Sequence, residues 1–277
     1  MEPRIQVGVG QKIGRIGKTQ KEQSQDTYFD QSCGLCRLVG VCDGHGPQGH
    51  LVSAFLAEQL PKVLFRKVAH KDIESLKAAL VQAYSECVRM LKTTSFDTTA
   101  SGSTCVSVLI TDTDMICANV GDCRAIVGRN IGGIWGVYQL SWDHKPDLPT
   151  EHRRIQSYGG EVSAPRLGPA RVFHKNKPFP GLSVSRTMGD DRAACAGVIS
   201  VPDVQAIHLA DWDRFMIVAS DGLWNVVNSM EAVSLLQPML ELGVERAAKG
   251  LVEEAERRWV QRTRGVDDIT ALVVLLQ

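Results

Sequence analysis

Four short acidic motifs hold the side chains of this sequence that are best suited to chemistry. Each joins an aspartate to an apolar run, and they lie at Val41–Gly44 (VCDG), Ala118–Asp122 (ANVGD), Val218–Gly222 (VASDG) and Val266–Asp268 (VDD). Carboxylates at strand edges can converge at one end of a sheet, and such hard oxygen ligands suit Mg²⁺ or Mn²⁺ better than a soft metal. Asp-Gly after a strand is also ordinary turn chemistry. The hypothesis of a binuclear hydrolytic site therefore depends on the combination of the motifs.

The first half of the chain is predicted to contain buried strands, two helices and further strands. Leu35–Cys42 (LCRLVGVC) is a short apolar run that leads into Asp-Gly, as a buried strand does. Gln48–Phe65 and Asp72–Leu91 place apolar residues at helical spacing. From Ser103 onward, β-rich runs are separated by Asp, Gly and Asn at hairpin intervals, which predicts an antiparallel meander.

The second half continues this segregated order. We expect a short helix over Pro149–Gly159, capped by Thr150. Ala164–Gly181 contains four prolines and little periodicity, and we expect a long surface loop that flanks a site. The remaining predicted elements are two strands at Val204–Leu209 and Phe215–Ser220, two helices at Met230–Leu240 and Val244–Arg262, and a strand at Ile269–Leu276. This order predicts an α+β protein in which helices cover antiparallel sheets, because a parallel sheet needs regular βαβ alternation.

The composition is that of an ordinary globular protein. The chain has 277 residues, of which 44% are hydrophobic and 22% charged, and these values exclude intrinsic disorder and a fibrous design. We expect one continuous domain over residues 1–277, because no internal repeat or linker-like tract is visible. The formal net charge is zero, so no global positive field attracts nucleic acid or an anionic membrane.

Targeting signals and cysteines indicate the cellular compartment in which we expect the protein. No run of 18 apolar residues occurs, so we expect no membrane span. The N-terminus carries Glu2 and Arg4 instead of the apolar core of a secretory signal, and Met1 is not followed by the glycine that myristoylation needs. Eight scattered cysteines favour a reducing compartment, and Cys33–Cys36 lacks the second pair of a zinc site. We expect a monomer in the cytosol or nucleus.

Seven motifs occur in the order of one known family. They are VCDGHG (Val41–Gly46), SGSTCV (Ser101–Val106), ANVGDCRA (Ala118–Ala125), DHKPDLPTEHRRIQSYGGEV (Asp143–Val162), LSVSRTMGD (Leu182–Asp190), VASDGLWNVV (Val218–Val227) and VDDITALVV (Val266–Val274). In these motifs the chain resembles the protein phosphatase 2C family, the metal-dependent serine/threonine phosphatases. The resemblance covers about residues 14–276. It implies a β-sandwich of two antiparallel sheets flanked by helix pairs, with the variable flap of the family at about 164–181.

The resemblance implies two Mg²⁺ or Mn²⁺ ions and their ligands. Asp43 resembles the carboxylate that bridges the ions, and the carbonyl of Gly44 resembles a further ligand. Asp221 and Asp267 resemble the other protein ligands of the first ion. Two ions about 3.5 to 4 Å apart lower the pKa of a shared water and clamp the phosphoryl oxygens for in-line attack, without a covalent phosphoenzyme.

Four further residues match positions of the family around these ions. Asp26 matches an acidic position that helps to hold metal-bound water, and Asp143 matches one associated with a third, weaker ion in some members. His45 resembles the general acid that protonates the leaving alkoxide, although a histidine in a turn can also be structural. Lys21 stands where many members have a phosphate-binding arginine, and the nearby Arg15 is a substitute. A merely solvated basic stretch is the alternative.

Other matching residues are expected to be structural, with Asp122 and Arg124 as a buried ion pair and Arg186 and Asp190 ordering the loop before them. The expected activity is hydrolysis of phosphoserine and phosphothreonine in proteins. Two alternatives are a non-catalytic phosphatase-like regulator and a hydrolase of small phosphoesters. Loss of metal aspartates would favour the regulator, whereas the chemistry of the ions is the same for large and small esters.

Overall fold

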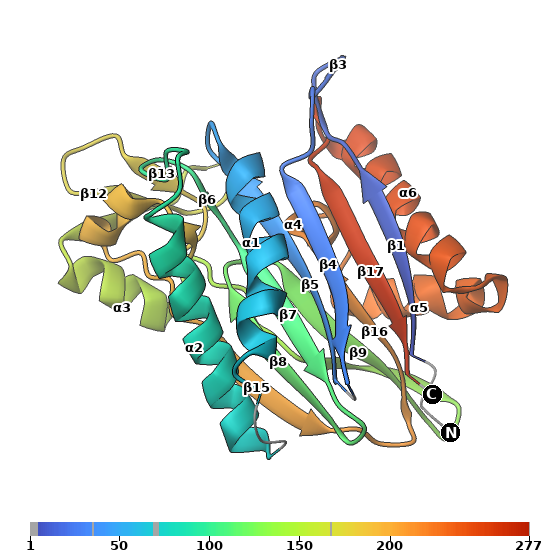
Figure 1. Ribbon diagram of the computed structural model, residues 1–277. Helices are drawn as coiled ribbons and strands as arrows, with labels where there is room; N and C mark the ends of the chain where they lie inside the picture. The colour runs from blue at the N-terminus through green and yellow to red at the C-terminus, as the bar shows by residue number, and fades with distance from the viewer. Residues whose placement is uncertain (1–4, 35, 69–71, 167, 277) are drawn as a thin grey trace.

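The computed structural model describes residues 5–34, 36–68, 72–166 and 168–276. Two antiparallel sheets pack face to face, and a pair of helices covers the outer face of each sheet (Figure 1). The predicted α+β sandwich is therefore confirmed. Met1 and Arg4, on which the expectation about a leader was based, lie outside the described residues.

The first sheet has the strand order β1-β17-β16-β9-β10. Its strands are β1 (Gln6–Lys12), β17 (Ile269–Leu275), β16 (Asp213–Ala219), β9 (Arg124–Ile131) and β10 (Ile134–Gln139). The second sheet has the order β14-β6-β5-β7-β8-β15, and β4 also pairs with β5. Its strands are β14 (Met188–Gly189), β6 (Gly102–Ser103), β5 (Cys36–His45), β7 (Cys105–Ile110), β8 (Asp114–Val120), β15 (Asp203–His208) and β4 (Asp26–Cys33).

Shorter strands form two small sheets beside the sandwich. The strands of the three-stranded sheet are β11 (Gly160–Ser163), β12 (Arg171–His174) and β13 (Pro180–Leu182), and those of the hairpin are β2 (Arg15–Ile16) and β3 (Thr19–Gln20). The helices are α1 (Gly49–Phe65), α2 (Ile73–Leu91), α3 (Pro149–Ser157), α4 (Asp221–Trp224), α5 (Ser229–Met239) and α6 (Val244–Arg262), with 3₁₀ turns η1 (Asp191–Ala196) and η2 (Leu240–Leu242). The long helices agree with the predicted ranges to within a residue or two.

The central strands, such as β7, β8 and β17, are buried on both faces, which explains why they are continuous apolar runs in the sequence. Successive side chains of a strand point to opposite faces. In β5, Val39 and Val41 pack between the two sheets, whereas Leu38 and Cys42 pack against α1 and α2. A third apolar layer lies between the first sheet and α5 and α6. This packing holds the ends of β5, β16 and β17 at one edge of the sandwich.

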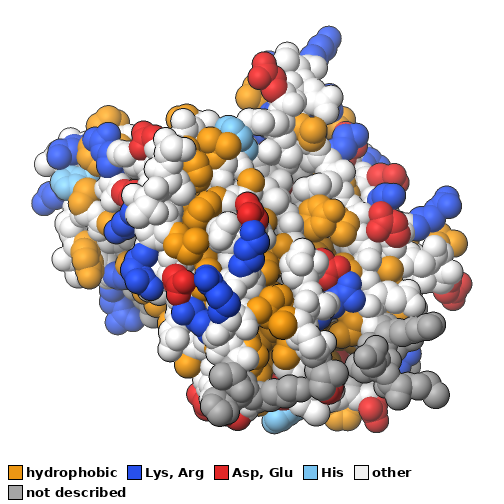
Figure 2. All heavy atoms as spheres, viewed as in Figure 1, with side chains coloured by type: hydrophobic (Ala, Val, Ile, Leu, Met, Phe, Trp, Pro, Cys, Tyr) orange, Lys and Arg blue, Asp and Glu red, His pale blue; other side chains and the backbone are white. Residues whose placement is uncertain are grey.

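The distribution of charged side chains on the surface agrees with the formal net charge of zero. On the face shown in Figure 2, acidic and basic side chains are interspersed. No helix within the described ranges is long and apolar enough to cross a membrane.

Three local predictions are wrong. The expected meander is divided, because β7 and β8 belong to the second sheet whereas β9 and β10 belong to the first. Thr150 does not cap α3, which has Leu148 at its N-cap and begins with Pro149. The expected loop at Ala164–Gly181 contains β12 and most of β13. Strands this short, with β12 pairing to β11 and β13 to β12, need no long apolar run.

The strand that carries the first acidic motif is longer than predicted. Leu35, its expected first residue, lies outside the described residues, and β5 continues from Cys36 to His45. Asp43 and Gly44 are thus part of the sheet and not of a turn that follows it. β1 and β4 were not predicted from the sequence. Both are edge strands: β1 pairs with β17, from the other end of the chain, and β4 pairs with β5, which follows it.

Candidate metal centre

A pocket of about 420 Å³ opens at the edge where the acidic motifs meet. Asp43 lies near the end of β5, Asp221 begins α4 directly after β16, and Asp267 comes two residues before β17. All three carboxylates line the pocket, together with Lys21 and His45. The sandwich therefore brings together residues that are more than two hundred positions apart in the sequence.

The residue after Asp43 must be glycine, because the surrounding backbone leaves no room for a side chain at that position. Asp43 faces Asp26 across the β4–β5 pair. The next amide, that of Gly44, donates to the carbonyl of Gln25 at 3.0 Å. A Cβ at Gly44 would lie 2.2 Å from the carbonyl oxygen of Gly49, so the close approach of α1 requires glycine here. This packing fixes the position of Asp43 at the pocket.

The carboxylates of the pocket repel one another. Burial raises the pKa of Asp43 well above its usual range, and the charges of Asp26, Asp221, Asp267 and Asp122 raise it further. Burial also raises the pKa of Asp221, with the charges of Asp122 and Asp267 as the next causes. Such a group is stabilised by a cation that its oxygens can share.

Asp26 carries an oxygen without a partner. Burial raises its pKa to about 7, although the hydrogen bond from Ser220 acts in the opposite direction. The Ser220 hydroxyl donates to Oδ2 at 2.6 Å. Oδ1 is buried and has no hydrogen-bond partner among the described residues. Because buried carboxylate oxygens are normally satisfied by protein, water or an ion, this atom fits a position beside bound water.

Some of the acidic side chains form ion pairs, and the carboxylates of the described residues do not form a closed chelate. Over residues 5–34, 36–68, 72–166 and 168–276, no group of three or more His, Cys, Asp or Glu side chains has a geometry that could hold a metal ion. Asp122 pairs with Lys145, and Asp267 lies 3.3 Å from the ammonium of Lys21. The donor set fits a hard divalent cation through its oxygen chemistry, its uncompensated charge and the orphan oxygen of Asp26.

Lys21 is held in the pocket by Asp268, a residue to which the sequence analysis assigned no role. The ammonium lies 2.9 Å from Oδ2 of Asp268, which also accepts from the amide of Gln25 at 3.0 Å. Burial lowers the pKa of Lys21, but Asp268 and Asp267 outweigh burial and the net pKa is raised. Arg15 does not line the pocket, and its buried Nε has no hydrogen-bond partner in the described part of the chain. The double aspartate in VDD was the only available signal for Asp268.

Asp143 is paired away from the pocket. Both of its oxygens accept from Arg124, at 2.8 and 2.7 Å, and it does not line the pocket. The predicted ion pair between Asp122 and Arg124 is therefore wrong, since Asp122 pairs with Lys145 instead. The chain turns at Gly121 (φ +106°), and the segment after β10 supplies a separate partner for each side chain.

His45 has a carboxylate partner that comes from a distant segment. Its Nε2 lies 2.5 Å from Oδ2 of Asp190 and 3.4 Å from the hydroxyl of Thr187. Asp190 also lines the pocket. The sequence predicted only that Asp190 orders a loop. Its contact with His45 was missed because 145 residues separate the two.

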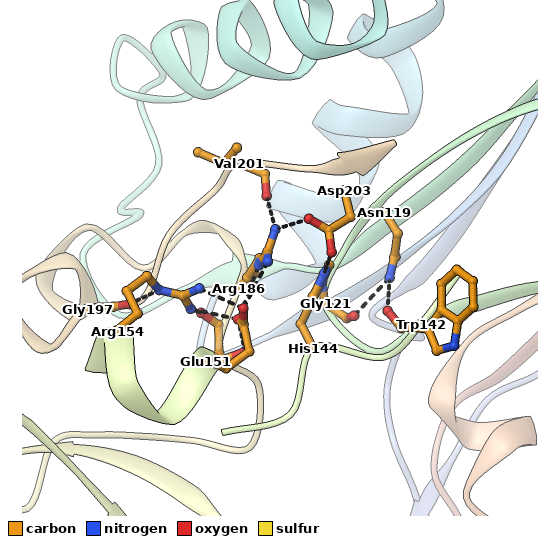
Figure 3. Close-up of polar contacts among 11 residues, drawn as sticks. Asn119, Gly121, Trp142, His144, Glu151, Arg154, Arg186, Gly197, Val201 and Asp203 are labelled. Carbon is orange, nitrogen blue, oxygen red and sulfur yellow. Dashed lines mark hydrogen bonds and ion pairs between the residues drawn. The ribbon is translucent and has the colours of Figure 1, made fainter. Parts of the chain in front are cut away.

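An ion-pair network anchors the segment that carries Asp190. Arg186 donates to Glu151 of α3 and to Asp203 of β15, and Asp203 also contacts His144 (Figure 3). Arg154 donates to the same Glu151 from one turn along α3 (Figure 3). The expectation that Arg186 orders this part of the chain agrees with these contacts.

Comparisons with known proteins show which family and fold the chain shares. Residues 19–263 match the family model described as Protein phosphatase 2C. Probable protein phosphatase 2C 72 of Arabidopsis thaliana is 36% identical over 255 residues, which cover 87% of this chain and 76% of that protein. Probable protein phosphatase 2C 64 of Oryza sativa subsp. japonica is 36% identical over 250 residues, covering 86% of this chain and 58% of that protein. The crystal structure of serine-threonine phosphatase 2C from Toxoplasma gondii covers 100% of this chain and 98% of its own, with a TM-score of 0.83 and 22% identity, and shows the shared fold.

Proposed function

The chain belongs to the protein phosphatase 2C family and is a metal-dependent protein serine/threonine phosphatase, and we propose how its own residues carry out the hydrolysis. The family depends on divalent cations such as Mg²⁺ or Mn²⁺. The observation that carries the proposal is that Asp43, Asp221, Asp267, Lys21 and His45 line one pocket. The proposed substrates are phosphorylated proteins.

Asp43, Asp221 and Asp267, with the carbonyl of Gly44, are the proposed ligands of two divalent cations. When bound, two such ions lower the pKa of a shared water and neutralise charge on the phosphoryl group. Burial and, after it, mutual repulsion raise the pKa values of Asp43 and Asp221, and that positive charge offsets both. The unpartnered Oδ1 of Asp26 would accept a hydrogen bond from water held beside the ligands.

Lys21 is the proposed phosphate-binding residue. Its ammonium lines the pocket, whereas Arg15 does not. The Lys21 ammonium has three N–H donors but lacks the paired, coplanar donors of an arginine, so it binds a phosphoryl oxygen as a point charge. Asp268 keeps the side chain in place. Its contact with Asp267 places it beside the proposed ligands.

His45 is the proposed proton donor. The alkoxide of serine or threonine is a poor leaving group, so protonation is needed as the P–O bond breaks. His45 lies two residues after Asp43 on the same strand and lines the same pocket. A third cation at Asp143 is not part of the proposal, because Arg124 already neutralises that carboxylate with two hydrogen bonds.

Phosphate release from a phosphothreonine peptide tests the proposal. Wild type should act only with added Mg²⁺ or Mn²⁺, and a chelator should stop the reaction. Asp43→Asn should lose more activity than His45→Ala, because the first removes a shared metal ligand and the second removes proton donation, worth roughly 10²- to 10⁴-fold. Calorimetric titration of Mn²⁺ should show weaker binding to Asp43→Asn.

Asp112→Asn is the matched control. Asp112 is an exposed aspartate in the turn between β7 and β8, at the opposite end of the strands from the pocket. It should leave activity and Mn²⁺ affinity unchanged. Equal activity of Asp43→Asn and Asp112→Asn would refute the assignment of ligands. Lower kcat/KM for the peptide than for p-nitrophenyl phosphate would favour the small-ester alternative.

A further inference from the structure

We infer that Asp190 is a positioning residue that selects which nitrogen of His45 faces the substrate. The inference deepens the proposed function, because it depends on His45 as the proton donor. Oδ2 of Asp190 lies 2.5 Å from Nε2 of His45, and the Asp190 side chain is only 4% exposed. An ionised carboxylate accepts hydrogen bonds and donates none, so this contact requires the proton on Nε2. Nδ1 has no hydrogen-bond partner among the described residues and remains for the substrate.

The sheet itself brings the two side chains together. β6 lies between β5 and β14, with Gly102 opposite His45 on one side and opposite Gly189 on the other. Asp190 follows β14 directly, and its amide donates to the carbonyl of Ser101 at 3.0 Å. The contact is therefore set by strand register and does not depend on a free loop.

Glycine at position 102 makes the space that the Asp190 carboxylate occupies. A Cβ there would lie 2.0 Å from Oδ2 of Asp190 and 2.6 Å from the hydroxyl of Thr187. Both of these side chains contact Nε2 of His45. The absence of a side chain at Gly102 is thus what allows the carboxylate to reach the ring.

The backbone of Asp190 is held in a rarely used conformation. Its φ of +49° and ψ of +48° lie in the left-handed region, which few residues other than glycine, asparagine and aspartate adopt. Such conformations persist where the surroundings over-determine them, typically at functional sites. Here Arg186 anchors the chain on one side through Glu151 and Asp203 (Figure 3), and η1 follows on the other.

The proton transfer balances with this arrangement. As the P–O bond to the serine or threonine oxygen breaks, that oxygen keeps the bonding electrons and takes the proton from Nδ1 of His45. The ring is left neutral with its remaining proton on Nε2, shared with Asp190. Without the carboxylate, either nitrogen can carry that remaining proton and the ring can rotate.

Leaving-group dependence tests the inference. Asp190→Asn and Asp190→Gly both tolerate the left-handed backbone. With each, kcat for a phosphothreonine peptide should fall at least about tenfold, a part of the full effect of a general acid. Turnover of p-nitrophenyl phosphate should change by less than about twofold, because nitrophenolate leaves without a proton. In a His45→Ala background, Asp190→Asn should have no further effect on the peptide, since the two act as a unit.

The controls separate this inference from the function on which it depends. Asp191→Asn changes the neighbouring exposed aspartate, which contacts Thr98, and should leave both substrates unaffected. Equal loss on both substrates, or an undiminished loss in the His45→Ala background, would make Asp190 merely structural and overturn the inference. If His45→Ala itself lowers both substrates equally, the proton-donor role fails and the inference fails with it. Metal-dependent hydrolysis would still support the rest of the proposed function.

Discussion

Replacement of Glu151 by glutamine should lower the free energy of unfolding by about 3 kcal/mol at neutral pH. Glu151 is buried in α3, and its carboxylate accepts from Arg154 and Arg186 (Figure 3). It also accepts from the hydroxyl of Ser185. Burial raises its pKa, but these donors outweigh burial and lower the pKa from 4.5 to about 2. At about 1.4 kcal/mol for each pH unit between the two values, the ionised form gains roughly 3 kcal/mol from folding.

The pH dependence gives this prediction its sign. The folded-state pKa of Glu151 lies below the unfolded-state value, so the stabilisation is fully present above pH 4.5 and is lost as the pH falls toward 2. Glutamine keeps the shape of the side chain, but it leaves the guanidinium groups of Arg154 and Arg186 without a shared counter-charge. The difference in stability between wild type and Glu151→Gln should therefore narrow as the pH falls through this range.

Urea unfolding at pH 7 and at several values down to pH 3 would measure the effect. Glu161→Gln makes the same chemical change at an exposed position of β11 and should alter stability by no more than about 0.5 kcal/mol. A loss below about 1 kcal/mol at pH 7 would refute the strength assigned to the network. A loss of the same size at every pH would show that packing, and not charge, is what glutamine disturbs.

Three further changes probe the core, a helix contact and the pocket. Tyr84→Phe removes a buried hydroxyl that bonds the carbonyl of Ala118 at 3.0 Å, and should lower the free energy of unfolding by about 1 kcal/mol in urea titrations. Gly8→Ala places a Cβ 2.2 Å from the carbonyl oxygen of Val244, so it should displace α6 and lower the melting temperature measured by calorimetry. Lys21→Met should lower kcat/KM for a phosphothreonine peptide about 10- to 100-fold, whereas Lys21→Arg should retain most of it, because only the first removes the cation that meets the phosphate.

Local patterns in the sequence were enough to predict most of the fold. The spacing of apolar residues over Gln48–Phe65 and Asp72–Leu91 predicted α1 and α2, because a helix that buries one face repeats with its own period. Segregated strands and helices predicted antiparallel sheets covered by helices. The pattern did not show that β8 and β9 belong to different sheets, since periodicity describes a strand and not its neighbours.

The candidate site, like the fold, could be predicted only in part from the sequence. The aspartates at the ends of apolar runs could be recognised from the sequence, since four such motifs occur together although each one alone is ordinary turn chemistry. The pairing of charges was decided by the fold: Arg124 meets Asp143 and not Asp122, and Lys21 is held by Asp268. Asp122 and Arg124 each meet a different residue of the segment after β10, Lys145 and Asp143, which local spacing does not reveal.

Residue types and local spacing were enough to predict most of the elements, the candidate ligands Asp43, Asp221 and Asp267, and the family. Tertiary structure alone decided which side chains touch, including the contact of His45 with Asp190 across 145 positions. The physical reason is that periodicity and residue type act over a few neighbouring residues. Contacts between distant segments depend on strand register and close packing, which are properties of the whole fold.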